Sequence, residues 1–281
     1  MRIDCHIHTR PDFRYMIGRK FDQKAFLADL RAANMDGGCI YSLSPTSYPE
    51  IPAEERMQYA LDVCEGCDTL FPFFWIDPLE KDALRQVDLA VEKGFAAFKM
   101  IPTTYRVDCP EAMAVLGKIA ETGKPVMFHS GICWDGIQSG ENNKPVIYEA
   151  MLKIPRLRFC LAHVSWPWYD ECIALYGKMQ YAYRKNPETT CEMFIDVTPG
   201  TPVPYREEVF RHLLLSYDMR NKLMFGSDCN TGDYAVEPCL GWQRIDDALY
   251  EKYVSGDVED FKARVYGGNL LRFLGIGGNL C

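Results

Sequence analysis

Residues 3–9 of the chain read IDCHIHT and place two histidines one residue apart in an apolar stretch. Side chains alternate between the two faces of an extended strand, so Asp4, His6 and His8 are predicted to point the same way. Two imidazoles that converge on one spot can bind a metal ion, but surface strands also contain His-x-His pairs. The stretch therefore predicts a strand with a metal-ligand pair, provided that the rest of the chain supports it.

Seven further apolar runs of strand length follow, separated by amphipathic stretches of helical length. The predicted strands are RIDCHIH (2–8), GGCIYSL (37–43), LFPFFWI (70–76), FAAFKMI (95–101), PVMFHS (125–130), LRFCLAH (157–163), CEMFIDV (191–197) and KLMFGSD (222–228). The predicted helices span residues 21–34, 53–66, 81–94, 110–123, 144–155, 167–185, 204–218 and 257–275. This alternation predicts one α/β domain over residues 1–281, a (β/α)8 TIM barrel with its active site at the C-terminal ends of the strands. A doubly wound sheet is the alternative, but no GxGxxG sequence follows the first strand.

Composition and charge disfavour several classes of protein. The net charge of -8 comes from 39 acidic and 31 basic residues without a long run of one sign, so nucleic-acid binding is not expected. The longest apolar patch, residues 70–76, is too short to cross a bilayer, and no apolar leader precedes the first strand. We expect a cytoplasmic protein without a membrane partner, whose 12 cysteines are reduced thiols.

The placement of the five histidines is informative. Four of them end predicted strands one, five and six: His6, His8, His129 and His163. Asp228 ends the eighth strand, whereas His212 lies within a predicted helix. Strand alternation predicts that three groups of residues face inward. They are Met127 with His129, Leu161 with His163, and Met224 and Gly226 with Asp228. Because active sites of barrels lie at this end, we expect the histidines and Asp228 to share one mouth.

Neutral imidazoles and a carboxylate together suit a divalent metal ion. Zn²⁺ is the first expectation, and Mn²⁺, Fe²⁺ or Co²⁺ would also be tolerated by such a ligand set. An open coordination position would hold water, whose pKa such a metal lowers towards about 7. The sequence therefore predicts chemistry based on a metal-activated water.

Five motifs, in order and over nearly the whole chain, resemble those of a known family. They are DCHIH (4–8), VMFHSG (126–131), LAHVSW (161–166), MFGSDCN (224–230) and GGNLLRFLGI (267–276). The chain resembles the amidohydrolase superfamily, and within it the amidohydrolase-related (amidohydrolase 2) family of metal-dependent hydrolases and decarboxylases. The last motif resembles that family's closing helix.

The resemblance implies specific roles for the strand-end residues. It implies His6, His8, His129 and Asp228 as ligands of one metal ion. His163 would then hydrogen-bond the substrate or the metal-bound water, and Asp228 could also accept the proton of that water.

Lys99 and Asp4 have two readings each. Lys99 ends strand four, where binuclear relatives carry a carboxylated lysine between two metals and single-metal relatives an unmodified one. We favour one metal, with Lys99 pairing with a substrate anion or a carboxylate. Asp4 could orient a ligand imidazole, or it could satisfy backbone donors deep in the barrel.

Loops that follow the strands are expected to contact the substrate. Arg14 and Tyr15 in the first loop offer a cation and a hydroxyl, and Trp134 and Trp166 in the loops after strands five and six offer apolar walls. Together they indicate a small, partly apolar, anionic molecule. A homodimer is compatible with the aromatic-rich surface segments.

Four functions remain open. The first is a metal-dependent hydrolase in which a metal-activated water attacks an amide, lactone or ester carbonyl. The alternative is a non-oxidative decarboxylase of a small unsaturated or aromatic acid, which would need an arginine partner. A phosphoesterase or DNase similar to the TatD group ranks lower, because residues 95–101 lack the glutamate of that group. A non-catalytic barrel ranks last, because no expected ligand is missing.

Overall fold

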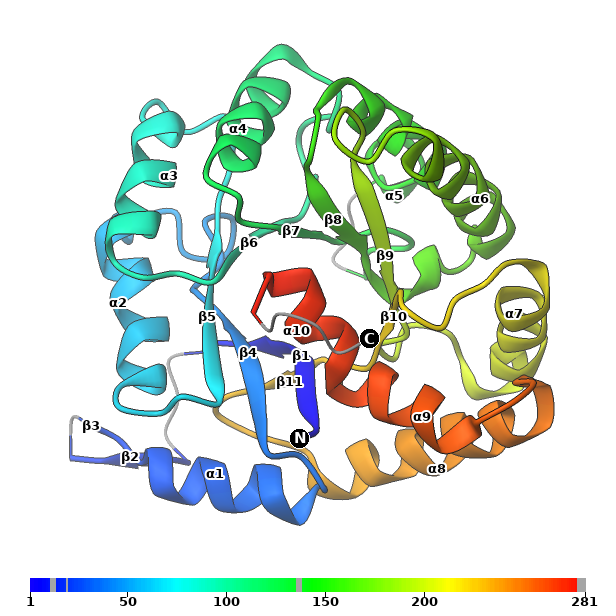
Figure 1. The fold of residues 1–281 in the computed structure, drawn as a ribbon. Helices are drawn as coiled ribbons and strands as arrows, with labels where there is room; N and C mark the ends of the chain where they lie inside the picture. Colours follow the sequence, from blue (N-terminus) through cyan, green and yellow to red (C-terminus); the bar gives the residue numbers. More distant parts are fainter. Residues whose placement is uncertain (11–13, 19, 135–137, 277–281) are drawn as a thin grey trace.

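The computed structural model describes residues 1–10, 14–18, 20–134 and 138–276. Nine parallel strands form one curled sheet with helices around it (Figure 1), in the order β10-β9-β8-β7-β6-β5-β4-β1-β11. The strands are β1 (Ile3–His8), β4 (Gly37–Tyr41), β5 (Leu70–Trp75), β6 (Ala97–Met100), β7 (Val126–Phe128), β8 (Arg158–Leu161), β9 (Glu192–Asp196), β10 (Leu223–Met224) and β11 (Cys229–Asn230). Each predicted strand is present, so the predicted TIM barrel is confirmed.

Backbone hydrogen bonds between β1 and residues 222–228, the eighth strand segment that contains β10, close the barrel. β10 pairs with β9 on one side. On the other side, the Cys5 N–H donates to the Phe225 carbonyl over 3.0 Å and the Asp228 N–H donates to the His6 carbonyl over 3.0 Å. The first and last strands are therefore neighbours, although more than 200 residues separate them.

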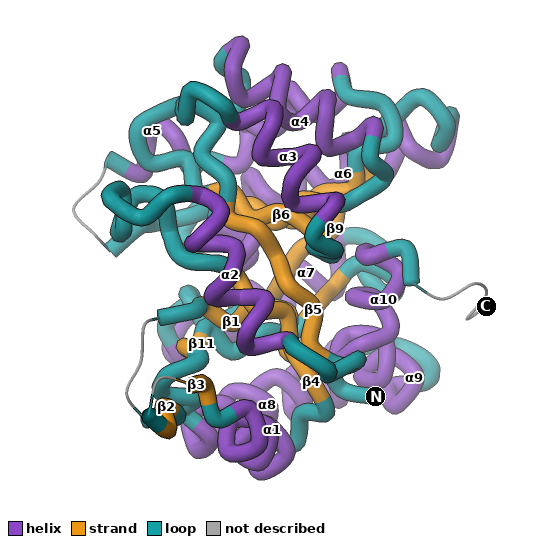
Figure 2. The backbone as a smooth tube through the Cα atoms, turned by 90° about the vertical axis from the view of Figure 1, so that its left-hand side faces the viewer, coloured by secondary structure: helices purple, strands orange, loops and turns teal. Residues whose placement is uncertain are grey.

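Helices cover the outside of the barrel, as Figures 1 and 2 show. They are α1 (Gln23–Ala32), α2 (Ala53–Cys64), α3 (Ala83–Glu92), α4 (Pro110–Glu121), α6 (Tyr169–Lys185), α7 (Val203–Ser216) and α8 (Val236–Tyr253). The sequence analysis assigned no helix to the α8 segment. The predicted helix 144–155 is instead the 3-10 helix η1 (Pro145–Lys153), which ends before Pro155. No helix among the described residues is long and apolar enough to cross a membrane.

The two ends of the barrel carry different short elements. In Figure 2, the N-terminus and α10 (Asn269–Leu274) lie at one end, and α5 (Ser139–Asn142) and the hairpin of β2 (Met16–Ile17) and β3 (Lys20–Phe21) lie at the other. The predicted helix 257–275 is divided into α9 (Val258–Ala263), the π-turn η3 (Arg264–Gly268) and α10. Gly267 is required in this turn, because an added Cβ would lie 2.3 Å from the Met1 carbonyl oxygen.

Two apolar clusters hold these layers together. The inner cluster fills the barrel and receives Leu270 and Phe273 from α10, whose Phe273 ring lies 5.2 Å from that of Phe194. The outer cluster lies between the strands and the surrounding helices. Because α10 closes the amino-terminal end, the open end is the one at which the strands finish. No disulfide joins the cysteines of the described residues.

The predicted inward and outward faces are wrong at two strands, β1 and β8, and both exceptions concern the candidate site. In β1 the register against β4 shifts between Asp4 and Ile7, which is a β-bulge. Cys5 consequently joins the inner cluster and Ile7 the outer one, so the prediction that Asp4 shares a face with His6 and His8 is wrong. In β8 the inner residues are Cys160 and Ala162, whereas Leu161 packs outside.

A buried ion pair anchors the end of β9 to the helical layer. Arg206 on α7 donates from Nε and Nη2 to the two carboxylate oxygens of Asp246 on α8, both over 2.7 Å, and from Nη2 to the Val197 carbonyl over 2.6 Å. Both side chains are almost fully buried. Removing one partner would therefore leave an uncompensated charge inside the protein.

We predict that Asp246→Ala lowers the free energy of unfolding by about 3–5 kcal/mol, measured by chemical denaturation. The double replacement Arg206→Met/Asp246→Leu should recover most of this loss, because it removes both charges. A single variant as stable as the parent protein would contradict the assignment.

Candidate metal centre

Three side chains from the closing strands bring ligand atoms together. His6 and His8 come from β1 and Asp228 from the turn before β11, and one potential ligand atom of each lies within 4.8 Å of the others. Asp228 Oδ1 is 3.4 Å from His6 Nε2 and 3.3 Å from His8 Nε2. His8 and Asp228 are partly exposed whereas His6 is buried, so the cluster lies at the wall of an open space.

The backbone around Asp228 is shaped for this approach. Asp228 has a φ of 60°, in the left-handed region that Asp tolerates better than most residues. Gly226 is required two residues earlier, because an added Cβ would lie 2.5 Å from both His6 Cβ and Thr198 Oγ1. The eighth strand can therefore pass close enough to β1 for its carboxylate to meet the two imidazoles.

The other two predicted histidines adjoin this cluster. The His163 ring lies 5.1 Å from that of His6 and 5.0 Å from that of His129, measured between centroids. His129 Nε2 and His163 Nδ1 are buried and have no hydrogen-bond partner among the residues that the structure describes. His129 is not part of the three-residue group. Its Nε2 could nevertheless coordinate a metal ion through its lone pair. The structure thus brings together all five residues that were predicted to share the mouth.

The electrostatic environment keeps the imidazoles neutral. Burial, and then the positive charge of Lys99, hold the pKa of His6 well below its usual value. Burial also lowers the pKa of His8, and burial together with His163 lowers the pKa of His129. Burial raises the pKa of Asp228, but the hydrogen bond with His8 and the neighbouring imidazoles outweigh it, so the net shift is downward. Neutral imidazoles beside a carboxylate fit a divalent cation.

Lys99 lies on β6 and is fully buried beside the cluster. Its Nζ is 3.3 Å from His6 Nε2 and 4.8 Å from the centre of the Tyr41 ring. Burial lowers the pKa of Lys99 to about 8, although Asp196 and Asp228 oppose the shift. The ammonium group therefore stands close to where a cation would bind.

Asp196, at the end of β9, is a site residue that the sequence analysis missed. It is fully buried, and its Oδ2 is 3.0 Å from His6 Nδ1. The other expected candidate, Asp4, does not contact an imidazole: it accepts from the backbone N–H groups of His6 and Ser227 and from the Tyr234 hydroxyl. Of the two readings of Asp4, the backbone role is the one that the structure supports. The signal for Asp196 was its place at the carboxyl end of the seventh strand.

A cavity of about 300 Å³ opens beside the cluster. Its polar lining consists mainly of His8, His129, His163 and Asp228. Its apolar lining includes Ile101, Ile132, Cys133, Trp134, Trp166 and Pro199. The rings of Trp134 and Trp166 are nearly parallel, with centroids 6.5 Å apart and an interplanar angle of 16°. Both tryptophans predicted to contact substrate therefore border the space in front of the histidines.

Arg14 and Tyr15 lie elsewhere. Arg14 pairs with Asp29 over 3.1 Å and with Asp233 over 3.0 Å. Tyr15 is buried against Phe21 and Phe26, and its hydroxyl donates to Asp29. Neither residue is among those that line the cavity, because these contacts tie the first loop to α1.

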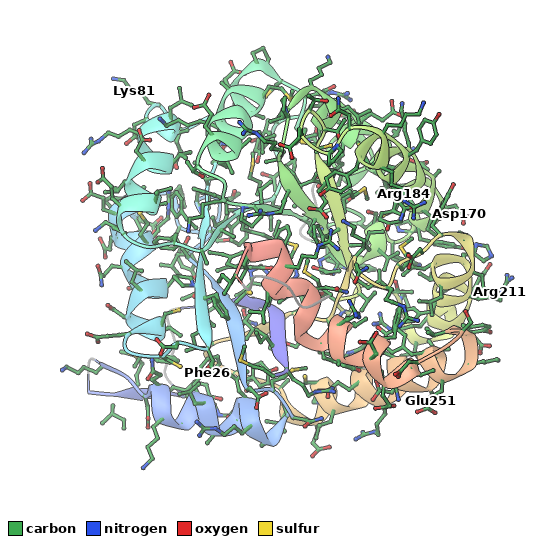
Figure 3. All side chains as sticks on the ribbon, viewed as in Figure 1. Phe26, Lys81, Asp170, Arg184, Arg211 and Glu251 are labelled. Carbon is green, nitrogen blue, oxygen red and sulfur yellow. The ribbon has the colours of Figure 1, made fainter. Side chains whose placement is uncertain are left out.

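His212 is separate from the site, as predicted. It lies on α7 at the outside of the barrel, where its Nδ1 is 2.9 Å from Asp170 Oδ1 and its Nε2 is 2.8 Å from Arg211 Nη2. Figure 3 labels Asp170 and Arg211 at the outer rim of the molecule.

Several solved structures share this fold at low sequence identity. A probable 2-pyrone-4,6-dicarboxylic acid hydrolase from Acinetobacter baumannii, with citric acid bound, is 13% identical with a TM-score of 0.63, covering 98% of this chain and 99% of that one. A 2,6-dihydroxybenzoate decarboxylase from Rhizobium is 12% identical with a TM-score of 0.61, covering 98% of both chains. A dihydroorotase from Campylobacter jejuni is 14% identical with a TM-score of 0.57, covering 99% of this chain and 84% of that one. These likenesses show the fold alone.

A search of curated proteins found no match. The family model for amidohydrolases of the Amidohydro_2 type, in contrast, matches residues 3–276. This range includes the five motifs on which the resemblance rests. The chain therefore belongs to the amidohydrolase family.

Proposed function

We propose that this amidohydrolase is a metal-dependent hydrolase that cleaves an amide, lactone or ester of a small, partly apolar substrate. The observation that carries the proposal is the cluster of His6, His8 and Asp228 at the wall of the cavity, with two buried, unpaired imidazole nitrogens beside it.

One divalent metal ion, with Zn²⁺ as the first expectation, would be held by His6, His8, His129 and Asp228. This donor set of nitrogen and oxygen atoms suits zinc and also tolerates Mn²⁺, Fe²⁺ or Co²⁺. When bound, such an ion polarises a carbonyl and lowers the pKa of water towards about 7. The favoured number is one metal, because the Lys99 ammonium group lies next to His6 and would repel a second cation.

Two residues of the chain would move or hold protons. Asp228 is a carboxylate at neutral pH, and we propose that it accepts a proton from an attacking water. His163 borders the cavity beside His129, and its Nδ1 has no partner among the described residues. We propose that its ring hydrogen-bonds the substrate carbonyl and holds it towards Asp228.

The cavity wall favours an apolar substrate body. The indoles of Trp134 and Trp166, together with Ile101 and Ile132, present apolar surface to the space in front of the histidines. The described residues that line the cavity include no arginine or lysine. The expectation of an anionic substrate therefore has no cation to support it among these residues, and we propose a substrate recognised by its apolar part.

We place hydrolysis above decarboxylation because the described cavity lining includes no arginine or lysine. A decarboxylase of this family would need a cation for the substrate carboxylate, and the described cavity lining offers none beyond a bound metal. Decarboxylation remains the second candidate, because a decarboxylase shares the fold.

The test is a paired assay on metal-loaded protein. Aryl esters, aryl lactones and anilides would be followed for hydrolysis, and hydroxybenzoates for release of carbon dioxide. Metal-dependent hydrolysis without carbon dioxide release is the expected result. Release of carbon dioxide alone would overturn the proposal in favour of the decarboxylase.

Metal content is predicted to depend on the histidines of β1. The purified protein incubated with Zn²⁺ should retain about one equivalent by elemental analysis, and His6→Ala or His8→Ala should retain less than about a tenth of that. His212→Ala is the matched control, because His212 lies outside the site, and it should bind like the parent. An equal zinc content in the parent and all variants would refute the ligand assignment. Two equivalents of zinc in the parent would instead favour Lys99 as a carboxylated group that bridges two metal ions.

His163→Ala should separate catalysis from metal binding. We expect kcat to fall by roughly 10²–10⁴-fold, because a group that hydrogen-bonds the reacting atoms is lost. Metal content should stay at the parent level, since His163 is not an assigned ligand. An unchanged kcat would remove His163 from the mechanism, whereas loss of metal would make it a ligand.

Trp166→Ala tests the apolar wall. For an aryl substrate we expect KM to rise by about 10-fold or more with little change in kcat, because burial of an aromatic group contributes to binding in the ground and transition states alike. Tyr181→Ala, which removes an exposed aromatic residue on α6, is the control. A Trp166→Ala variant with an unaltered KM would show that the substrate does not use this wall.

A further inference from the structure

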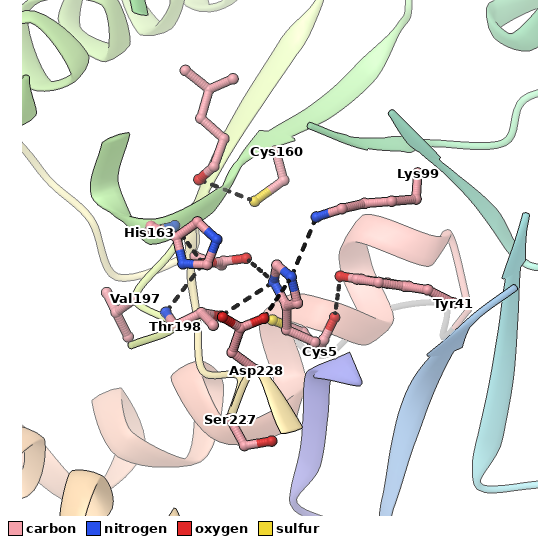
Figure 4. Close-up of polar contacts among 12 residues, drawn as sticks. Cys5, Tyr41, Lys99, Cys160, His163, Val197, Thr198, Ser227 and Asp228 are labelled. Carbon is pink, nitrogen blue, oxygen red and sulfur yellow. Dashed lines mark hydrogen bonds and ion pairs between the residues drawn. The ribbon is translucent and has the colours of Figure 1, made fainter. Parts of the chain in front are cut away.

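Asp196 contacts two parts of the site at once. Its Oδ2 lies 3.0 Å from His6 Nδ1, and its Oδ1 accepts hydrogen bonds from the backbone N–H groups of His163, over 2.8 Å, and Thr198, over 3.0 Å. Figure 4 shows the polar contacts around His163, Thr198 and Asp228. One buried carboxylate thus joins a ligand residue from β1 to the loops after β8 and β9.

The contact with His6 determines which ring nitrogen is free. A carboxylate can only accept hydrogen bonds, so its partner Nδ1 must carry the imidazole proton. Nε2 then keeps its lone pair; it lies 3.3 Å from the Lys99 ammonium nitrogen, which can donate to it, and 3.4 Å from Asp228 Oδ1. The Thr198 hydroxyl is also near Nδ1, at 3.4 Å, but a hydroxyl can donate or accept and does not select the tautomer.

The contact with His163 holds a strained backbone. His163, Val164 and Ser165 have φ values of 59°, 49° and 56°, three successive left-handed residues without a glycine. Such conformations are unfavourable for residues other than glycine and persist only where surrounding contacts hold them. The hydrogen bond from the His163 N–H to Asp196 fixes the first of these residues, and this turn is what directs the His163 ring to the cavity.

We propose that Asp196 is a positioning residue that fixes the His6 tautomer for metal binding and the His163 turn for catalysis. The inference rests on the proposed function and adds to it a physical link between metal affinity and the orientation of His163. Asp196 touches neither the cavity nor a substrate, because it is fully buried and is not part of the lining.

Asp196→Asn separates the two contacts. The asparagine oxygen can still accept from the N–H groups of His163 and Thr198, but its NH₂ group would donate to His6 Nδ1 and move the imidazole proton to Nε2. We expect the metal dissociation constant, measured by competition with a chromophoric chelator, to rise by roughly 10- to 100-fold. Nitrogen-15 NMR of the metal-free protein should show the Nδ1–H tautomer of His6 in the parent and the Nε2–H tautomer in the variant.

Asp4→Asn is the matched control. Asp4 is also fully buried and accepts from two backbone N–H groups, one of them that of His6, but it contacts no imidazole. Its replacement should leave the tautomer unchanged and the metal dissociation constant within about threefold of the parent. An equal loss of affinity in both variants would assign the effect to stability and overturn the inference.

Asp196→Ala removes both contacts and tests the second role. At saturating metal, its kcat should fall further than that of Asp196→Asn, because only alanine releases the His163 turn; equal values would refute the role in the turn. Parent-like metal affinity in Asp196→Asn would refute the role in the tautomer. If the parent protein binds no metal, the proposed function fails, and the NMR measurement on His6 still decides whether Asp196 sets the tautomer.

Discussion

The closure of the barrel between β1 and the eighth strand segment is the constraint on which the site depends. The Cys5 and His6 backbone groups bond to Phe225 and Asp228 across this seam. It sets two imidazoles and a carboxylate within 4.8 Å of one another, although they come from opposite ends of the chain. Gly226 allows this approach, since any side chain there would collide with His6 and Thr198. The fold therefore makes the ligand cluster as a direct consequence of closing its sheet.

Burial gives the cluster its chemical character. Imidazoles inside the barrel lose solvation for their charged form and stay neutral. Burial raises the pKa of Asp228, but the hydrogen bond with His8 helps to lower it overall, so this side chain stays ionised. The nearby Lys99 adds positive charge that further disfavours protonation of His6. Burial and the neighbouring charges thus leave imidazole lone pairs and one carboxylate directed at the same space. Such an arrangement can bind a divalent cation. A cavity with apolar walls beside it gives such an ion access to a substrate.

Periodicity predicted the strands well because each lies between two apolar layers, and it predicted His129 and Asp228 at the mouth because they follow such strands. It failed where the backbone departs from regular geometry. The bulge in β1 moved Asp4 away from the face of the histidines, and the left-handed turn after β8 directs His163 inward although Leu161 faces outward. Asp196 was missed because its role depends on how close the end of β9 comes to β1, and α8 because the polar Gln243 and Asp246 interrupt its buried face. Arg14 could not be placed from sequence, since its partners Asp29 and Asp233 come from distant segments.

The central claim is that histidine side chains at the strand ends hold one divalent metal ion together with Asp228. X-ray absorption spectroscopy of the zinc-loaded protein tests it most directly, because the spectrum reports the atoms bound to the metal. The account predicts a shell of nitrogen and oxygen atoms at about 2.0–2.1 Å, with the multiple scattering that imidazoles produce. A sulfur shell near 2.3 Å, or a spectrum without imidazole scattering, would contradict it.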